Sequence, residues 1–115
     1  MQHLAWENVR LEILNEKLSR KVVNGEKVMV SQLWFTKGSL VPLHQHESEQ
    51  ISLILQGAMT FELEGREVTV RAGEVLVIPS NVPHSALAIE DTAGIDVFSP
   101  IRYDWLDGTD TYLRK

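Results

Sequence analysis

The sequence predicts an all-β fold in which short strands close into one antiparallel barrel. Three observations support this prediction: the apolar segments are short, they are β-branched or alternate with a period of two, and turn dipeptides separate them. No segment of helix length with helical periodicity intervenes. The 115 residues have the length of one domain, and we expect residues 1–115 to form it.

Eight segments carry the strand pattern, and strands of this kind bury one another as a sandwich or a barrel. The expected strands are 18–23, 27–35, 50–55, 58–64, 67–70, 75–78, 84–89 and 95–98. Residues 9–15 fit either a strand or a single turn, and residues 100–106 fit a short helix or a turn. We expect the aromatic residues and Met59 to fill the barrel or a dimer interface: Trp34, Phe35, Phe61 and Trp105.

Four dipeptides predict chain reversals between these strands. Asn24-Gly25 and Glu64-Gly65 are typical of two-residue hairpins, because Asn and Gly accept the left-handed backbone that such turns need. Gln56-Gly57 and Ala72-Gly73 predict two further reversals.

Composition and charge argue against several functional classes. The net charge of −5 argues against nucleic-acid binding, which requires clustered Lys and Arg. The absence of Cys excludes disulfides, thiolate nucleophiles and Cys-based metal sites. No apolar run approaches the roughly 20 residues of a membrane span, and the first residues do not resemble a signal peptide. We therefore expect no membrane partner and a cytoplasmic location.

Three of the four histidines form two clusters, His44-Gln45-His46 and Pro83-His84. Alternate side chains of an extended segment share a face, so His44 and His46 point the same way, as does Gln50 if the strand continues without a bulge. Imidazoles gathered on one face suggest a metal site, although His-x-His alone is a weak signal. Glu49 is one residue out of register, and we expect it in solvent unless a bulge reverses the parity. Lys37, near this cluster, is also expected in solvent.

The order of these residues resembles the two motifs of the cupin family. The first, G-x5-H-x-H-x3-E-x6-G, is matched over residues 38–57, and the second, G-x5-P-x-G-x2-H-x3-N, over residues 73–88. The matching residues are Gly38, His44, His46, Gln50, Gly57, Gly73, Pro79 and His84. Gln50 replaces the family's Glu, Asn81 its middle Gly, and Ala88 its last Asn. The resemblance implies a jelly-roll barrel, or double-stranded β-helix, with one metal held by His44, His46, Gln50 and His84.

Gln50 gives this implied site an unusual charge. Three imidazoles and an amide are all neutral, so a divalent ion keeps its full charge and becomes a stronger Lewis acid and anion trap. The same substitution weakens a dioxygenase interpretation, because two His and a carboxylate are the commonest mononuclear iron set. The donor set suits Zn, Ni, Fe, Mn or Cu, and the identity of the metal stays open.

Residues 95–106 add a narrower resemblance. Asp96-x-Phe98-Ser99-Pro100-x-Arg102 is similar to the D-x-F-S-P-x-R ending of small KdgF-type cupins, which open unsaturated uronate rings. The resemblance implies that Asp96 and Arg102 are the catalytic pair and that Arg102 and Phe98 contact the substrate. Strand parity puts Asp96 and Phe98 on one face, and a turn at Pro100 would fold Arg102 over the barrel mouth.

The two resemblances together therefore imply a metal-dependent lyase or isomerase of carbohydrate metabolism. Its substrate would be a small anionic sugar, a 4,5-unsaturated uronate from pectin or alginate, converted to the linear keto form. A cupin-type dioxygenase and a non-catalytic sugar- or metabolite-binding cupin are the alternatives. A homodimer is expected as well, because the family's small members are commonly dimers and exposed strand edges favour pairing.

Overall fold

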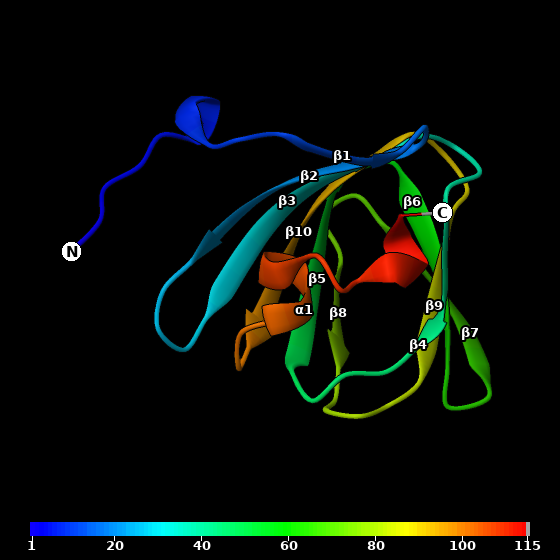
Figure 1. Cartoon of the computed structure of the whole chain (residues 1–115). Helices are drawn as coiled ribbons and strands as arrows, with labels where there is room; N and C mark the ends of the chain where they lie inside the picture. The colour runs from blue at the N-terminus through cyan, green and yellow to red at the C-terminus, as the bar shows by residue number, and fades with distance from the viewer. Residues whose placement is uncertain (115) are drawn as a thin grey trace.

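Two antiparallel sheets face each other in the computed structural model, which describes residues 1–114 (Figure 1). One sheet has six strands in the order β1-β2-β3-β10-β5-β8, and the other has four in the order β4-β9-β6-β7. The strands are β1 (Glu12–Asn15), β2 (Leu18–Asn24), β3 (Met29–Phe35), β4 (Leu40–His44), β5 (Glu49–Gln56), β6 (Ala58–Leu63), β7 (Arg66–Arg71), β8 (Val75–Ile78), β9 (His84–Ala88) and β10 (Thr92–Ser99). The expected all-β jelly-roll fold is confirmed.

All eight expected strands are present, and two more appear. Seven of the eight match to within two residues at each end, whereas the segment expected at 95–98 extends to Thr92–Ser99. The first additional strand, β1, lies in the segment 9–15, which the sequence left open between a strand and a turn; its four residues are too few for a clear period-two pattern. The second, β4, contains Pro42, which weakens a strand signal because proline has no N–H to donate to the ladder.

The two expected hairpins differ in outcome. Glu64-Gly65 forms the expected two-residue turn, since Leu63 pairs with Arg66 and both turn residues have positive φ, 51° and 70°. The two-residue prediction for Asn24-Gly25 is wrong, because Asn24 pairs with Met29 and residues 25–28 form a four-residue loop. The inward-facing side chains of β3 set this register, so burial overrides the local turn preference.

The core lies between the inner faces of the sheets. Its buried aliphatic and aromatic side chains are Leu14, Leu18, Met29, Leu33, Phe35, Ile54, Met59, Phe61, Val70, Ile78, Ala86, Ala88, Phe98, Ile101, Trp105 and Leu113. Trp34, by contrast, points outward from the six-stranded sheet. The residues expected in the core therefore lie there, apart from Trp34, which stays available for an interface.

The C-terminal residues cross the open end between the sheets (Figure 1, orange to red). They form a one-turn helix, α1 (Tyr103–Asp107), and a 3-10 turn, η2 (Thr111–Leu113). A third short helix, η1 (Trp6–Asn8), precedes β1. Among the described residues, no helix is both long and apolar enough to cross a membrane.

Candidate metal centre

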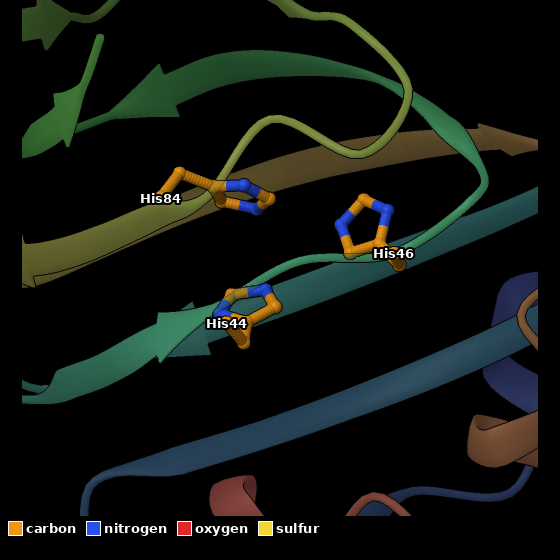
Figure 2. A group of neighbouring side chains, drawn as sticks. All are labelled: His44, His46 and His84. Carbon is orange, nitrogen blue, oxygen red and sulfur yellow. The ribbon is translucent and has the colours of Figure 1, made fainter.

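His44, His46 and His84 meet at the open end of the barrel (Figure 2). One ring nitrogen from each lies within 4.8 Å of the other two. His44 ends β4 and His84 begins β9, and the two residues are direct partners in the antiparallel register. The ladder is irregular between Val41 and His44, and a bulge of this kind re-aims the side chain that follows it. The two histidine clusters of the sequence thus form one group.

The condition set for Gln50, one strand that continues from His44 without a bulge, is not met. The chain leaves the four-stranded sheet after His44, and β5 begins at Glu49 in the six-stranded sheet. His46 therefore lies in the connection between the sheets rather than on a strand. The side chains converge because the chain crosses the barrel mouth here, not because they share a strand face.

Backbone carbonyls fix the orientation of all three imidazoles. Each Nδ1 lies 2.8 Å from a carbonyl oxygen, which can only accept a hydrogen bond, so Nδ1 carries the proton and Nε2 keeps a free lone pair. The accepting carbonyls belong to Pro42, Ser48 and Val82, respectively. Hydrogen bonds of this kind are typical of histidines that ligate metals.

Burial keeps these imidazoles neutral. Desolvation lowers the pKa of His44 and of His46 to about 4, and it lowers the pKa of His84 as well. The Nε2 atom of His84 is buried and has no hydrogen-bond partner. A buried, neutral acceptor that lacks a donor is suited to a cation.

Gln50 completes the group from β5. Its Oε1 lies 3.1 Å from Nε2 of His46, and its Nε2 donates to Oγ of Ser52 at 2.9 Å. With Nδ1 of His46 protonated, two lone pairs face each other across the 3.1 Å gap, an arrangement that a cation between them would stabilise. Three imidazole nitrogens and an amide oxygen fit a divalent transition metal. Glu49 is exposed and Lys37 is exposed, both as expected.

Asp96 lies on the inner face of β10, with Phe98 two residues further along the same face. Its cross-strand partner is Ser52, whose hydroxyl donates to Oδ1 of Asp96 at 2.7 Å. Burial raises the pKa of Asp96 to about 6, although the Ser52 hydrogen bond and the charge of Arg102 act in the opposite direction. Burial therefore outweighs the effect of Arg102 on the pKa of Asp96. At pH 7 the carboxylate form still predominates.

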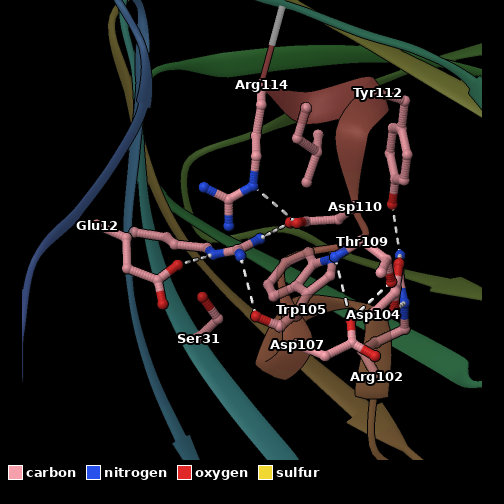
Figure 3. A network of polar contacts seen from close by, with 12 residues as sticks. Glu12, Ser31, Arg102, Asp104, Trp105, Asp107, Thr109, Asp110, Tyr112 and Arg114 are labelled. Atoms are coloured by element: carbon pink, nitrogen blue, oxygen red, sulfur yellow. Dashed lines mark hydrogen bonds and ion pairs between the residues drawn. The ribbon is translucent and has the colours of Figure 1, made fainter.

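Arg102 is buried, with only 4% of its surface exposed. Its Nε and Nη2 atoms donate to the two carboxylate oxygens of Asp104 at 3.0 and 2.8 Å, and Nη2 also donates to the hydroxyl of Tyr112 (Figure 3). The guanidinium carbon lies 5.2 Å from the centre of the Phe98 ring. Arg102 therefore lies at the barrel mouth, as expected. The hydrogen bonds found within the described chain do not use its Nη1 atom, which is left for a ligand.

Tyr112 closes the barrel mouth. Its ring stacks on that of His44 with centroids 4.5 Å apart and an interplanar angle of 25°. The cavity beneath has a volume of about 50 Å³. Its polar lining residues are His44, Gln50, His84, Asp96, Arg102 and Tyr112. Three of the four predicted metal ligands, His44, Gln50 and His84, therefore border one cavity with the predicted catalytic pair, and Phe98 lies in its wall.

Three residues of this site were not predicted from the sequence: Ser52, Asp104 and Tyr112. Ser52 had a usable signal, because it is a lone hydroxyl in the apolar run Ile51–Leu55 and shares the strand parity of Gln50. Asp104 lies two residues after Arg102, but a surface carboxylate has the same pattern. Nothing local marks Tyr112, which reaches the site only through the folding of the C-terminal segment.

The two facing sheets and the histidine cluster between them define a small jelly-roll protein with a candidate metal site. A family model described as the cupin domain matches residues 35–97, more than half of the chain. The chain belongs to the cupin family.

Individual relatives differ in their functions. The structure of KdgF from Halomonas sp. is 32% identical and superimposes with a TM-score of 0.80, covering 86% of this chain and 94% of that one. The oxalate-binding protein of Thermotoga maritima is 33% identical over 81 residues, which are 70% of this chain and 64% of that protein. Rat (Rattus norvegicus) 3-hydroxyanthranilate 3,4-dioxygenase is 31% identical over 74 residues, which are 61% of this chain but 26% of the enzyme.

Proposed function

We propose that the protein is a metal-dependent enzyme that opens the ring of 4,5-unsaturated uronates, acting as a lyase or isomerase in pectin or alginate breakdown. The observation that carries this proposal is the shared cavity, which brings Asp96 and Arg102 to the same space as His44, Gln50 and His84. The similarity to KdgF over 94% of that chain supports it.

The metal would be a single divalent ion, Zn, Ni, Fe or Mn, held by the three imidazoles and the amide of Gln50. When bound, it would supply Lewis acidity toward the oxygens of the anionic substrate. The four neutral ligands cancel none of its charge, which suits a uronate better than a site that contains a carboxylate.

Asp96 would carry the proton. As a carboxylate it removes the proton of the anomeric hydroxyl while the C1–O5 bond breaks, which leaves an aldehyde at C1 and an enolate at O5. Asp96 then returns the proton to C4, and the enolate becomes the ketone at C5, so atoms and charge balance without a co-reactant. Its pKa of about 6 favours both transfers near neutral pH, because an acid–base catalyst works best when its pKa lies near the working pH.

Arg102 would hold the substrate carboxylate or the developing enolate oxygen. Nε and Nη2 are held by Asp104 and Tyr112, so the guanidinium is fixed before a ligand arrives, and Nη1, which makes none of these hydrogen bonds, could donate to the ligand. A preorganised donor inside a buried site stabilises negative charge more than the same donor does in water.

Tyr112 would have to move before a sugar could bind. A cavity of about 50 Å³ has room for an ion and a few waters, but not for a pyranose ring. Displacing the Tyr112 ring from His44 opens the space above the cluster. Substrate entry would therefore require a rearrangement of the C-terminal segment.

The small cavity also favours a second candidate function, the binding of a small dicarboxylate. The oxalate-binding protein of Thermotoga maritima is one of the curated relatives, and a dianion of that size could contact the metal and Arg102 with less movement of Tyr112. This candidate predicts tight oxalate binding without turnover.

A second copy of this chain would cover the outer face of the six-stranded sheet. The register aligns an outward-facing row of Val30, Val97, Ile51 and Val77 across neighbouring strands, next to a row that contains Ile95, Leu53 and Val75. A continuous apolar face of this kind is uncommon on monomers. A homodimer with twofold symmetry would bury it.

Kinetics with the metal-loaded protein test the proposed reaction. Unsaturated uronate released by a pectate or alginate lyase should lose its near-ultraviolet absorbance faster with the protein than without it. Asp96→Asn and Arg102→Ala should each slow this loss roughly 10²- to 10⁴-fold and leave the metal content unchanged. A wild-type rate equal to the spontaneous rate would refute ring opening, and oxygen consumption with an aromatic substrate would favour a dioxygenase instead.

A further inference from the structure

Ser52 connects the candidate metal ligand Gln50 to Asp96. Its side chain lies on the inner face of β5, two residues after Gln50, and only 1% of its surface is exposed. Its Oγ accepts a hydrogen bond from Nε2 of Gln50 at 2.9 Å and donates one to Oδ1 of Asp96 at 2.7 Å. Gln50 is buried and Asp96 half-buried in the same cavity wall, where water competes little for these contacts.

The single hydroxyl proton gives this chain of hydrogen bonds a direction. An ionised Asp96 can only accept, so it takes the proton of Ser52. The Ser52 oxygen is then left as an acceptor, and only the NH₂ end of the Gln50 amide can satisfy it. The opposite end of the amide, Oε1, must therefore point toward the histidines.

Without this constraint, the amide of Gln50 would favour the reverse orientation. The free lone pair of His46 Nε2 lies 3.1 Å from Oε1, and turning the amide over would place an N–H donor opposite that lone pair. The reversed amide would present hydrogens, not an oxygen, to a cation. The orientation that suits a metal therefore depends on contacts made on the other side of Gln50.

We propose that Ser52 is a positioning residue that fixes the amide of Gln50 with its oxygen toward the metal, using Asp96 as the acceptor that sets the direction. The inference rests on the metal site of the proposed function and not on uronate as the substrate. It also accounts for Gln rather than Glu at position 50. A carboxylate there would compete with Asp96 for the one Ser52 proton.

Metal affinity tests this role directly. The metal-free protein is titrated with Co²⁺ and with Zn²⁺ against a chromophoric chelator, for wild type, Ser52→Ala and Ser52→Thr. Ser52→Ala should bind both ions about 10- to 100-fold more weakly, the usual effect of losing a contact that orients a ligand. Ser52→Thr keeps the hydroxyl and should restore most of the affinity. The visible spectrum of the bound Co²⁺ should change in Ser52→Ala and return in Ser52→Thr.

Ser31 offers a matched control. It is also a buried serine, it lies directly across from Asp96 on β3, and its hydroxyl donates to the backbone carbonyl of Lys21. Ser31→Ala removes a hydroxyl from the same neighbourhood without touching Gln50. Its metal affinity and Co²⁺ spectrum should match those of the wild type.

Three results would overturn the proposal. The first is wild-type metal affinity and spectrum in Ser52→Ala, and the second is an equal loss of metal affinity in Ser52→Ala and Ser31→Ala. The third is failure of Ser52→Thr to restore metal affinity although this variant unfolds at the wild-type temperature. Failure of the uronate reaction is a separate outcome. If wild type does not open the sugar but Ser52→Ala still loses metal affinity, the substrate assignment fails and the role of Ser52 stands.

Discussion

Each histidine of the candidate metal centre is held neutral by burial and held in one tautomer by a backbone carbonyl. An ordinary histidine, with a pKa near 6.5, must lose a proton before it binds a metal in mildly acidic solution. Here the pKa of His44 and of His46 is about 4, and that of His84 is also lowered. The site is therefore ready to bind a cation at pH values where most histidine sites are protonated.

This difference predicts a flat pH profile for metal binding. Because the folded, metal-free protein binds few protons at these imidazoles above their lowered pKa, the affinity for Zn²⁺ should change little between about pH 7 and pH 5 and fall only nearer pH 4. At pH 5, ordinary histidines would each weaken binding roughly 30-fold. Calorimetric titrations in buffers of different ionisation enthalpy measure both the affinity and the protons released. A release of one or more protons per ion at pH 6 would contradict the prediction.

At the scale of elements, the C-terminal segment is attached to the barrel by a buried charge network. Arg20 on β2 is fully buried, and it pairs with Glu12 at 2.8 Å and with Asp110 at 2.7 Å. Its guanidinium carbon lies 4.1 Å from the centre of the Trp105 ring, and Asp110 also pairs with Arg114 at 2.9 Å (Figure 3). These contacts hold Trp105 in α1 and Asp110 just before η2, so they determine the positions of Arg102 and Tyr112 in the C-terminal segment.

Breaking this network should release the segment without emptying the metal site. Asp110→Asn leaves the buried Arg20 without one of its charged partners, and the free energy of unfolding should fall by about 3–5 kcal/mol. The rate of ring opening should fall strongly because Arg102 loses its position, while the metal content should stay near that of the wild type. Denaturant unfolding and elemental analysis measure the two effects.

An exposed ion pair provides the control for this variant. Arg71 and Glu90 lie 3.8 Å apart with both side chains in solvent. Glu90→Gln should leave activity intact and change the free energy of unfolding by less than about 1 kcal/mol, because water screens such pairs. Equal losses of unfolding free energy and activity in Asp110→Asn and Glu90→Gln would mean that the buried network contributes no more than an exposed ion pair.

A second prediction at this scale concerns the turn from β5 to β6. Gly57 has a φ of 85°, and a Cβ there would collide with the backbone oxygen of Asp91 and approach Cα of Thr92 to 2.9 Å. Gly73 has the same φ, but a Cβ on it would meet nothing within 4 Å. Gly73→Ala should cost about 1–2 kcal/mol for the left-handed backbone alone, and Gly57→Ala clearly more. Chemical denaturation measures the free energy of unfolding of both variants. Equal decreases in Gly57→Ala and Gly73→Ala would show that the close approach at Gly57 carries no additional cost.

At the scale of the whole molecule, the two sheets have different outer surfaces. The six-stranded sheet carries the apolar rows described above, with Val77 52% exposed. On the four-stranded sheet, Leu87 is 41% exposed. If the six-stranded sheet forms the dimer, a charge at Val77 would be buried against the partner at a large cost.

Light scattering should therefore give twice the chain mass for the wild type and a single chain mass for Val77→Glu. Leu87→Glu places the same charge on the other sheet and should leave the dimer intact. A monomeric wild type at working concentration would refute the dimer. Dissociation by Leu87→Glu but not by Val77→Glu would place the interface on the four-stranded sheet.

Local sequence patterns predicted some elements of this fold and not others. The strands from Leu18 to Asn24 and from Val75 to Ile78 follow from local alternation, and the histidine spacing correctly anticipated that His44, His46 and His84 meet. The parity argument put Asp96 and Phe98 on one strand face, and the structure shows that this is the inner face. Parity does not apply between His44 and Gln50, where the chain changes sheets and alternation along one strand no longer relates the two side chains.

The sequence by itself determined the β class, the Glu64-Gly65 hairpin and the grouping of the histidines, because alternation, turn chemistry and spacing are local properties. Only the tertiary structure decided the stacking of Tyr112 on His44, the burial of Arg20 with Asp110, and the contact of Ser52 with Asp96. Each of these joins residues more than 40 positions apart, and such pairs form only when strand register and the closing of the barrel bury both partners together.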